Sequence, residues 1–361
     1  IPYTISGPPG TGKTKTLVEA TLQILRRQPD ANILLCAPSN SAADTLTKRL
    51  TRTLKPQEMF RLNAPERTFA EVPEEILLYC HITSMNGNEE EEGGGDLRPT
   101  LQEPVIALCG DTAQLGPMIH SHQARSGGLD LSLLDRLTER EDGGGDRGDP
   151  PPICSQLVRN YRSGHASLLM IPSNLFYSDL LIPCAKPTER IKGWKGLPNR
   201  EVAIYFDNVK GKDIWVDEGV SWYNQAEINR IVEIIKSLTA AFEEEEEEEK
   251  VREIAVMTPF NEQVWRLRLA LRGKGLGSVN VGPIEAFQGS EHSVSILSTV
   301  RSRARFLERD MERGLGLIFE SKRFCVSITR AKEALIVVGD GEMLKVDPYW
   351  RVFLETCLRN R

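Results

Sequence analysis

Two patterns of hydrophobic and polar positions alternate along the chain. Short apolar runs, which are typical of strands buried in a parallel sheet, occupy residues 1–6, 31–37, 105–109, 202–206, 254–257, 293–300 and 334–338. Between them, apolar residues recur every three or four positions, which predicts helices with one buried face. These helices fall at 14–27, around 46–50, and at 72–79, 129–137, 167–176, 225–238, 261–271 and 322–331. Strands that alternate with helices in both halves predict an α/β fold with parallel sheets.

Two low-complexity segments interrupt this alternation, NGNEEEEGGGD at 86–96 and EDGGGDRGDPPP at 141–152. Neither segment has the apolar residues needed to build a core. The chain has 361 residues, which is enough for two domains. We place the boundary at the second segment, so that the domains are 1–150 and 151–361. Because the first residue already lies in a strand pattern, we expect the chain to be a fragment of a longer protein.

The overall composition is that of a globular protein, with 40% hydrophobic and 27% charged residues. No apolar run is long enough to span a membrane. The formal net charge of −6 is unusual for a protein that binds nucleic acid, but two glutamate runs, 89–92 and 243–249, cause it. Without those eleven residues the net charge would be +5. The acidic balance therefore does not exclude a nucleic-acid partner.

The seven cysteines form no Cys-x-x-Cys pair. Three of them, Cys36, Cys109 and Cys325, lie in apolar runs. We expect these three to be reduced core residues of a cytoplasmic protein, and we expect neither metal ligands nor disulfides.

The first strand is followed by GPPGTGKT at 7–14, which matches the phosphate-binding pattern G-x-x-x-x-G-K-[ST]. Glycines let backbone N–H groups close around phosphate oxygens, so the loop Gly7, Pro8, Pro9, Gly10, Thr11, Gly12, Lys13 and Thr14 predicts a nucleotide site. Lys13 would contact the β- and γ-phosphates and Thr14 would bind Mg²⁺, while the helix that follows would direct its positive end at the nucleotide. The alternative is a glycine-rich turn before an ordinary helix, but strand, loop and helix follow in the order that the motif requires.

Six segments together resemble the motifs of a superfamily 1 RNA helicase of the up-frameshift type. They are similar to motifs I, Ia, III, IV, V and VI of that family and lie at 7–14, 37–44, 110–117, 157–163, 284–302 and 326–340. Segments 60–76 and 347–357 narrow the resemblance to the Moloney-leukaemia-virus-ten and Armitage type of RNA helicase. The resemblance implies two RecA-like P-loop domains that use ATP and Mg²⁺ to move 5′ to 3′ along single-stranded RNA. It also implies a link to RNA silencing or RNA turnover and to the proteins of those processes, in a cytoplasmic monomer without a membrane partner.

The resemblance implies roles for five residues at the nucleotide, which the family binds between its two domains. Arg162 and Arg330 would stabilise the charge that spreads over the γ-phosphoryl oxygens in the transition state, and Gln114 would sense the γ-phosphate or orient water. Tyr161 would stack on the base, and Glu291 would bond the ribose. The alternative for either arginine alone is a surface salt bridge.

Three further residues are expected to contact RNA, again by resemblance: Ser39, Asn40 and Thr258. Contacts to phosphate and sugar carry little sequence information, so we expect low sequence specificity. Ser39 or Asn40 is also a plausible helix N-cap, and Thr258 with Pro259 is also a plausible strand end.

Motif II of the family, Asp-Glu-Ala-Gly or a close variant, has no counterpart between residues 45 and 109. In the family its Asp binds Mg²⁺ and its Glu activates water. The only Asp-Glu pair, Asp217-Glu218, lies in the second half on a polar segment. We therefore expect poor hydrolysis, an exposed sheet edge at 105–109, and a role for Asp111 in supporting the loop that carries Gln114. A nucleotide-gated RNA-binding protein without turnover and a DNA helicase of the same superfamily remain alternatives.

Overall fold

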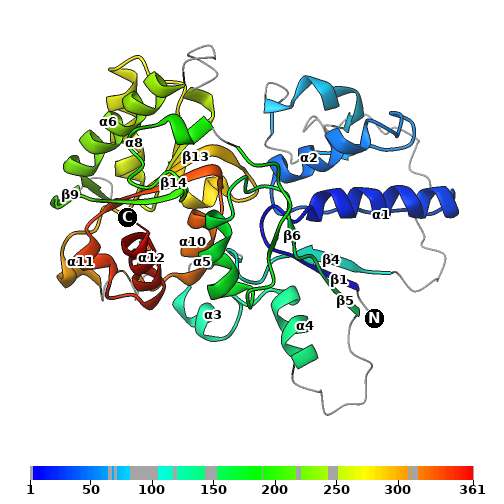
Figure 1. The fold of residues 1–361 in the computed structure, drawn as a ribbon. Helices are drawn as coiled ribbons and strands as arrows, with labels where there is room; N and C mark the ends of the chain where they lie inside the picture. The colour runs from blue at the N-terminus through cyan, green and yellow to red at the C-terminus, as the bar shows by residue number, and fades with distance from the viewer. Residues whose placement is uncertain are drawn as a thin grey trace. The chain divides into compact units, whose positions relative to one another are not determined.

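The structure is a computed structural model (Figure 1), and it describes residues 3–63, 67–68, 71–81, 105–116, 119, 121–142, 153–188, 190–216, 221–242, 251–307, 310 and 316–360. Contacts between residues divide the chain into two compact units. The smaller unit contains 12–107, and the larger contains 3–11 and 108–361. The glutamate runs and Asp217-Glu218 lie outside the described residues. No helix of the described ranges combines the length and the hydropathy needed to cross a membrane.

The smaller unit is built on helices α1 (Lys13–Arg27) and α2 (Asn40–Leu50). Apolar side chains of the two helices, among them those of Leu22 and Leu50, pack together in its core. The Ser39 hydroxyl caps α2 by accepting a hydrogen bond from the backbone N–H of Ala42 at 3.3 Å. Both helices and the cap were predicted from the sequence and are confirmed. The remaining elements are a 3-10 helix (Glu74–Tyr79) and the parallel strands β2 (Arg61–Leu62) and β3 (Cys80–His81).

The strand expected at 31–37 does not form in this unit. No strand is assigned there, the Leu34 side chain is 88% exposed, and Cys36 is exposed rather than in the core. An apolar run becomes a strand only where the edge of another strand is available for hydrogen bonding. The two described strands of this unit, β2 and β3, pair with each other, and neither pairs with residues 31–37.

The larger unit contains a five-stranded sheet in the order β12-β11-β13-β14-β8, with all neighbours parallel (Figure 1). Its strands are β8 (Ile204–Asn208), β11 (Ile254–Thr258), β12 (Asn280–Pro283), β13 (His292–Ser298) and β14 (Ala331–Gly339). Val256 packs into the core on one face and Met257 into the core on the other, as the period of two along a strand requires. Burial on both faces explains why these strands read as continuous apolar runs.

Helices cover both faces of this sheet. One core contains residues of α6 (Gln225–Ala241) and α8 (Asn261–Arg272). The other contains residues of α5 (Ser167–Phe176), α10 (Ser321–Ile328) and α12 (Pro348–Arg359). The buried Trp350 of α12 donates its indole N–H to the carbonyl oxygen of Leu317 at 3.0 Å. Six further helices of the described residues are short or lie outside these cores: α3 (His122–Ser126), α4 (Leu133–Asp142), α11 (Gly341–Leu344) and the 3-10 helices Arg190–Gly193, Ile284–Phe287 and Ala304–Phe306.

A second sheet of three strands has the order β4-β1-β5, with β4 (Ala107–Gly110), β1 (Tyr3–Ser6) and β5 (Ile153–Gln156). Among the described strands β4 has a single neighbour, so the exposed edge predicted at 105–109 is confirmed. The remaining strands form two pairs: β6 (Arg159–Asn160) with β7 (Ile182–Pro183), and the antiparallel β9 (Asp213–Val216) with β10 (Ser221–Asn224). The chain is an α/β protein with parallel sheets, as predicted.

A buried carboxyl group lies at the carboxyl end of the five-stranded sheet. Glu227 of α6 is fully buried and accepts hydrogen bonds from the Ser298 hydroxyl at 2.6 Å and from the backbone N–H of Val300 at 3.0 Å. Val300 has φ of +68°, a left-handed conformation that is rare for a β-branched residue. Burial raises the pKa of Glu227 from 4.5 to about 8, because desolvation outweighs the effect of these hydrogen bonds.

We therefore predict that this carboxyl makes stability depend on pH. Between pH 4.5 and about 8 the folded Glu227 keeps a proton that the unfolded chain releases, so its stabilising contribution is lost as pH rises through this window. Thermal unfolding midpoints at about pH 6 and about pH 8 should differ less in Glu227→Gln than in the parent chain. Glu233→Gln changes an exposed carboxyl of the same helix and should keep the parental difference. An equal difference in Glu227→Gln and the parent chain would contradict the prediction.

Candidate functional site

Three of the predicted motifs begin where neighbouring strands end. The backbone N–H of Gly7, after β1, donates to the carbonyl oxygen of Gly110 at the end of β4 at 3.1 Å. The N–H of Leu157, after β5, donates to the carbonyl oxygen of Ser6 at 2.8 Å. The carboxyl edge of a parallel sheet is where α/β proteins place their ligand contacts. Motifs I, III and IV therefore start from one such edge.

The turn after β1 is fixed by contacts with motif IV. The side-chain amide of Asn160 donates to the carbonyl oxygen of Pro9 at 2.8 Å, and the N–H of Tyr161 donates to the carbonyl oxygen of Gly10 at 2.8 Å. Gly10 has φ of +77°, and a Cβ atom there would lie 2.5 Å from the Cβ of Arg162. Only glycine fits, because any side chain would meet both the unfavourable φ and this clash.

The predicted loop residues thus fall into two groups. Gly7, Pro8, Pro9, Gly10 and Thr11 belong to the larger unit, where the Thr11 hydroxyl donates to the carbonyl oxygen of Pro8 at 2.8 Å. The rest of the loop belongs to the smaller unit: Gly12 precedes α1 with φ of +88°, and Lys13 and Thr14 are the first residues of that helix. The strand, loop and helix that the sequence predicted are all present.

The sequence analysis missed the role of Asn160. Besides its bond to the loop, its side-chain oxygen accepts hydrogen bonds from the backbone N–H groups of Arg162 and Ser163, both at 2.9 Å. Asn160 therefore shapes the turn that carries Arg162. An Asn followed by polar residues at a turn is the available signal, because Asn side chains often bond the backbone two residues further on.

Arg162 lies in an ion pair. Its Nε is 2.9 Å from Oε2 of Glu291, and its Nη1 donates to the carbonyl oxygen of Thr329 at 2.8 Å. Burial lowers the pKa of Arg162, although Glu291 partly opposes this shift. Burial raises the pKa of Glu291, but the charges of Arg162 and Lys332 outweigh it and lower the pKa overall. Glu291, expected at the ribose, here pairs with Arg162, and Tyr161, expected to stack on the base, is 57% exposed.

Arg330 is buried without such a partner. It is 1% exposed, and among the described residues no carboxylate lies within ion-pair distance of it. Its hydrogen bonds go to neutral acceptors, which are the carbonyl oxygens of Val326, Phe287 and Ser290, the hydroxyl of Thr329 and the side-chain oxygen of Gln114. Burial and, to a smaller extent, the positive charge of Arg162 lower the pKa of Arg330 to about 9. A buried and unneutralised cation is energetically unfavourable, so an anion at this place would be stabilised.

Asp111 supports the loop that carries Gln114, as predicted. Its carboxylate accepts hydrogen bonds from the N–H of Ala113 at 3.2 Å and from the side-chain amide of Gln114. It also accepts one from the Tyr177 hydroxyl at 2.9 Å, a contact that the sequence did not indicate. Burial raises the pKa of Tyr177, and Cys325 and Asp111 raise it further, so the phenol stays a neutral hydrogen-bond donor to Asp111.

The three expected RNA contacts belong to different units. Ser39 and Asn40 lie at the start of α2 in the smaller unit, where the side-chain oxygen of Asn40 accepts from Nη2 of Arg61 at 3.0 Å. Thr258 ends β11 in the larger unit, is fully buried, and its hydroxyl has no hydrogen-bond partner among the described residues. Their roles stay predictions.

The residues present fit a nucleotide better than a metal held by protein alone. The described part of the chain has no group of three or more His, Cys, Asp or Glu residues placed to hold a metal ion. The Thr14 hydroxyl is the metal ligand that the motif supplies. Mg²⁺ commonly keeps several waters and takes further ligands from substrate phosphates, so Thr14 together with a bound triphosphate is a chemically consistent set.

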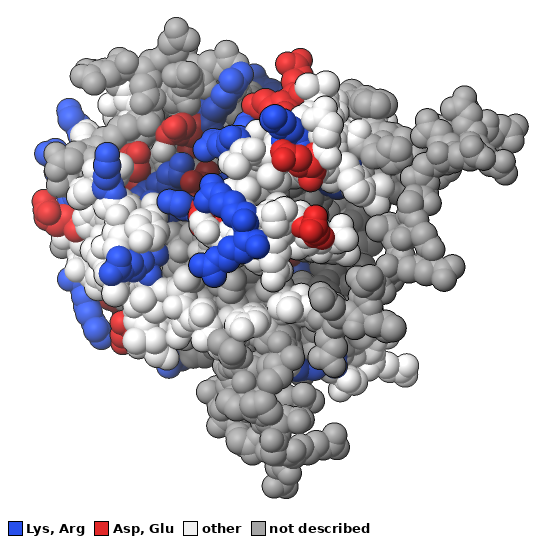
Figure 2. All heavy atoms as spheres, turned by 90° about the vertical axis from the view of Figure 1, so that its right-hand side faces the viewer, with Lys and Arg blue, Asp and Glu red and all other residues white. Residues whose placement is uncertain are grey.

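Basic side chains gather on part of the described surface. Figure 2 shows one face on which Lys and Arg, in blue, form a larger cluster than Asp and Glu, in red. The two glutamate runs that make the net charge negative are not among the described residues. The described basic residues of this face are compatible with a polyanionic ligand.

Comparisons with known proteins identify relatives along the whole chain. A family model described as an AAA domain matches residues 129–342, and a second with the same description matches 3–93. "RNA helicase Mov10l1" from Homo sapiens is 36% identical over 100% of this chain and 33% of its own length. "Putative helicase MOV-10" from Gallus gallus is 33% identical over 99% of this chain and 44% of its own length. "Probable RNA helicase armi" from Drosophila melanogaster is 28% identical over 100% of this chain and 37% of its own length.

The chain thus spans less than half of the length of these relatives. Among solved structures, that of the PRRSV helicase has 14% identity and a TM-score of 0.45, and it covers 96% of this chain and 54% of that one. This similarity is too distant to support an argument about the site. The ordered motifs and the relatives together show that the chain belongs to the AAA-domain family and, within it, to the superfamily 1 helicases of the Moloney-leukaemia-virus-ten and Armitage type.

Proposed function

We propose that the chain is the motor core of an ATP-dependent RNA helicase, which binds ATP through residues 7–14 and moves 5′ to 3′ on single-stranded RNA. The observation that carries the proposal is Arg330. It is a buried guanidinium without a carboxylate partner, bonded to Gln114 of motif III, in a chain whose P-loop pattern is intact. The γ-phosphate of a bound nucleotide would supply the anionic partner that Arg330 does not have among the described residues.

The roles of the residues follow from the charge of a triphosphate. Backbone N–H groups of the loop would bind phosphate oxygens, and Lys13 would contact the β- and γ-phosphates. Arg330 and Arg162 would stabilise the charge that develops on the γ-phosphoryl group. Because Glu291 holds Arg162 at 2.9 Å, a bound phosphate would compete with that carboxylate. Mg²⁺, held in part by Thr14, neutralises phosphate charge when it is bound.

RNA is the proposed polymer because two relatives, "RNA helicase Mov10l1" and "Probable RNA helicase armi", are named as RNA helicases. Ser39, Asn40 and Thr258 would contact the RNA backbone, and Thr258 would have to become accessible first, since it is buried here. We propose that the protein is a cytoplasmic monomer. We also propose that it acts in RNA silencing or RNA turnover and contacts proteins of those processes. A DNA helicase of the same superfamily is the alternative that a 2′-hydroxyl-sensitive binding assay would distinguish.

A second candidate function is nucleotide-gated RNA binding without efficient hydrolysis. It is favoured by the missing motif II, since no Asp-Glu pair follows an apolar run in the first half of the chain. The alignment with the human relative extends over 410 residues, more than the 361 of this chain, so that relative has residues with no counterpart here. Without the motif II carboxylates, the water that attacks the γ-phosphate has no predicted base.

The first prediction concerns nucleotide binding. Lys13→Ala should weaken ATP binding by about tenfold or more, because a charge-assisted contact to phosphate is lost, and should leave adenosine binding nearly unchanged. Isothermal titration calorimetry measures both. Lys15→Ala, which removes an exposed lysine of the same helix, is the matched control. Equal ATP affinity in Lys13→Ala and the parent chain would refute the assigned phosphate contact.

The second prediction concerns coupling of nucleotide to RNA. A non-hydrolysable ATP analogue should change the affinity for single-stranded RNA by about fivefold or more, a typical coupling between two sites. Arg330→Ala should abolish this change in RNA affinity. Gln114→Ala, which removes one hydrogen-bond partner of Arg330, should abolish it too. Arg359→Ala changes an arginine whose side chain is 79% exposed and should retain it. Fluorescence anisotropy of a labelled RNA measures the effect. If the parent chain binds RNA with equal affinity with and without the analogue, this result would argue against a motor.

The third prediction concerns turnover. The chain should bind ATP but hydrolyse it poorly, with or without RNA. Replacing residues 86–104 by a strand, an Asp-Glu-Ala-Gly turn and a helix typical of the family should raise RNA-stimulated ATPase by about a hundredfold, the usual effect of a positioned general base. The same replacement with Asn-Gln in place of Asp-Glu is the control. Robust hydrolysis by the unmodified chain that is lost in Lys13→Ala would show that another carboxylate has this role.

A further inference from the structure

The five-stranded sheet ends at β8, whose only neighbour among the described strands is β14. The N–H of Leu335 donates to the carbonyl oxygen of Ala203, and the N–H of Val209 donates to that of Gly339. In a parallel ladder, alternate residues of a strand bond to one neighbour, so the odd-numbered residues of β8 bond to β14. The backbone groups of Ile204, Phe206 and Asn208 therefore face the free edge.

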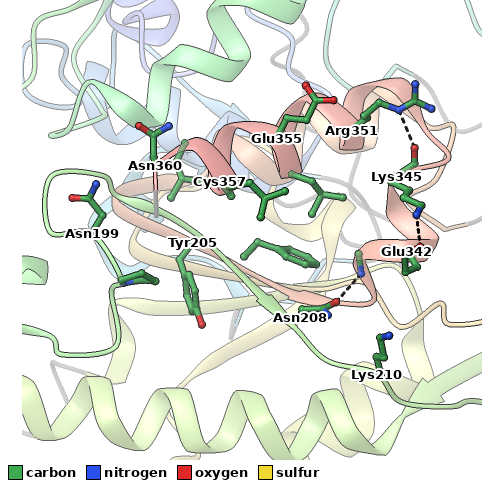
Figure 3. Close-up of a pocket in the computed structure, with 16 residues that line it drawn as sticks. Asn199, Tyr205, Asn208, Lys210, Glu342, Lys345, Arg351, Glu355, Cys357 and Asn360 are labelled. Carbon is green, nitrogen blue, oxygen red and sulfur yellow. Dashed lines mark hydrogen bonds and ion pairs between the residues drawn. The ribbon is translucent and has the colours of Figure 1, made fainter.

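A cleft of about 450 Å³ lies along this edge, between β8 and helix α12 (Figure 3). Its apolar lining includes Ile204 and Phe206 from β8 and Leu354, Cys357 and Leu358 from α12. Figure 3 shows Tyr205 pointing away from α12, whereas the even-numbered residues of β8 belong to the core that α12 covers. The cleft is thus an unfilled part of the layer between the sheet and α12, open beside the strand.

One end of the cleft is positively charged. Lys210 follows β8 and lines the cleft, and it forms no ion pair with any described residue, although its charge, after that of Lys345, lowers the pKa of Glu342. The nearby Lys345 is already paired with Glu342. The side-chain oxygen of Asn208 accepts from the N–H of Gly341 at 3.0 Å, which fixes the backbone turn beside this end. An occupant with an acidic group at this end would be attracted to Lys210.

We propose that the cleft binds an extended acidic peptide, which adds to the sheet as a further strand beside β8. A residue placed opposite Phe206 on such a strand would point to the same face of the sheet, and therefore into the space under α12. Backbone hydrogen bonds to the free edge would supply affinity, and the apolar cleft would select the side chain, as in other cases of strand addition. An acidic residue near the end of the added strand would pair with Lys210. This site uses none of the residues assigned to the nucleotide.

The distinguishing feature of this occupant is its backbone. A small apolar molecule would fill the cleft without using the strand edge, and single-stranded RNA would use Lys210 and Arg351 without filling the apolar space. The backbone groups of β8 that pair with no described strand lie beside the apolar lining, and an extended polypeptide satisfies both.

Two labelled peptides, TVTFTDE and its reverse EDTFTVT, test the proposal in both strand directions by fluorescence anisotropy with the full chain. At least one should bind with a dissociation constant of about 100 µM or tighter. That peptide is then N-methylated at its odd positions or at its even positions. One of the two patterns should weaken binding about tenfold or more, because only alternate N–H groups face β8. The other should bind nearly as the parent does.

Variants of the protein test the two side-chain contacts. Lys210→Glu should weaken binding about threefold or more, and a peptide with Lys in place of its acidic residues should restore it. Lys236→Glu makes the same charge change on α6 and should have no effect. Leu354→Trp should fill the cleft and weaken binding, with its thermal unfolding midpoint as a check of folding. Failure of both peptides to bind, equal binding of both N-methylated forms, or displacement of the peptide by a uridine decamer would each overturn the proposal.

Discussion

The buried guanidinium of Arg330 is the group on which the geometry of the site depends. A cation that is 1% exposed must be surrounded by oriented dipoles, and this one obtains them from three separate segments. The preceding helix α10 supplies Val326, the turn before β13 supplies Phe287 and Ser290, and motif III supplies Gln114. One side chain thereby fixes the relative positions of motifs III, V and VI, which are far apart along the chain.

The same requirement explains the arrangement around motif III. Asp111 accepts hydrogen bonds from the Gln114 side chain and the Tyr177 hydroxyl, so the oxygen of Gln114 is left to accept from Arg330. Asp111 is close enough to stabilise the charge of Arg330 but does not form an ion pair with it. The result is a cation held in position but only partly neutralised, which is the state in which an added phosphate would have the largest effect.

Much of the larger unit could be predicted from the sequence, because strands covered by helices on both faces must be apolar throughout. The runs that became β11, β13 and β14 show this. Residues 31–37 have the same apolar pattern but form no strand. The pattern indicates that a segment can be buried in a sheet, but it does not show whether another strand lies beside it. The contact of Asn160 with Pro9 joins residues 151 positions apart, and Tyr177 reaches Asp111 across 66. Such partners are set by tertiary packing, which explains why the supporting contacts of Asn160 and Tyr177 could not be predicted from the sequence.

The left-handed backbone of Val300 has a consequence for how this position can vary. Its side chain is fully buried with Trp222 and Phe260, while its N–H and carbonyl oxygen are bonded to Glu227 and Asn224. Glycine would remove the backbone strain but leave a cavity, and a larger residue would keep the strain and overfill the space. A substitution at Val300 therefore exchanges backbone strain against packing, and its effect on stability depends on the neighbouring Glu227 and Trp222.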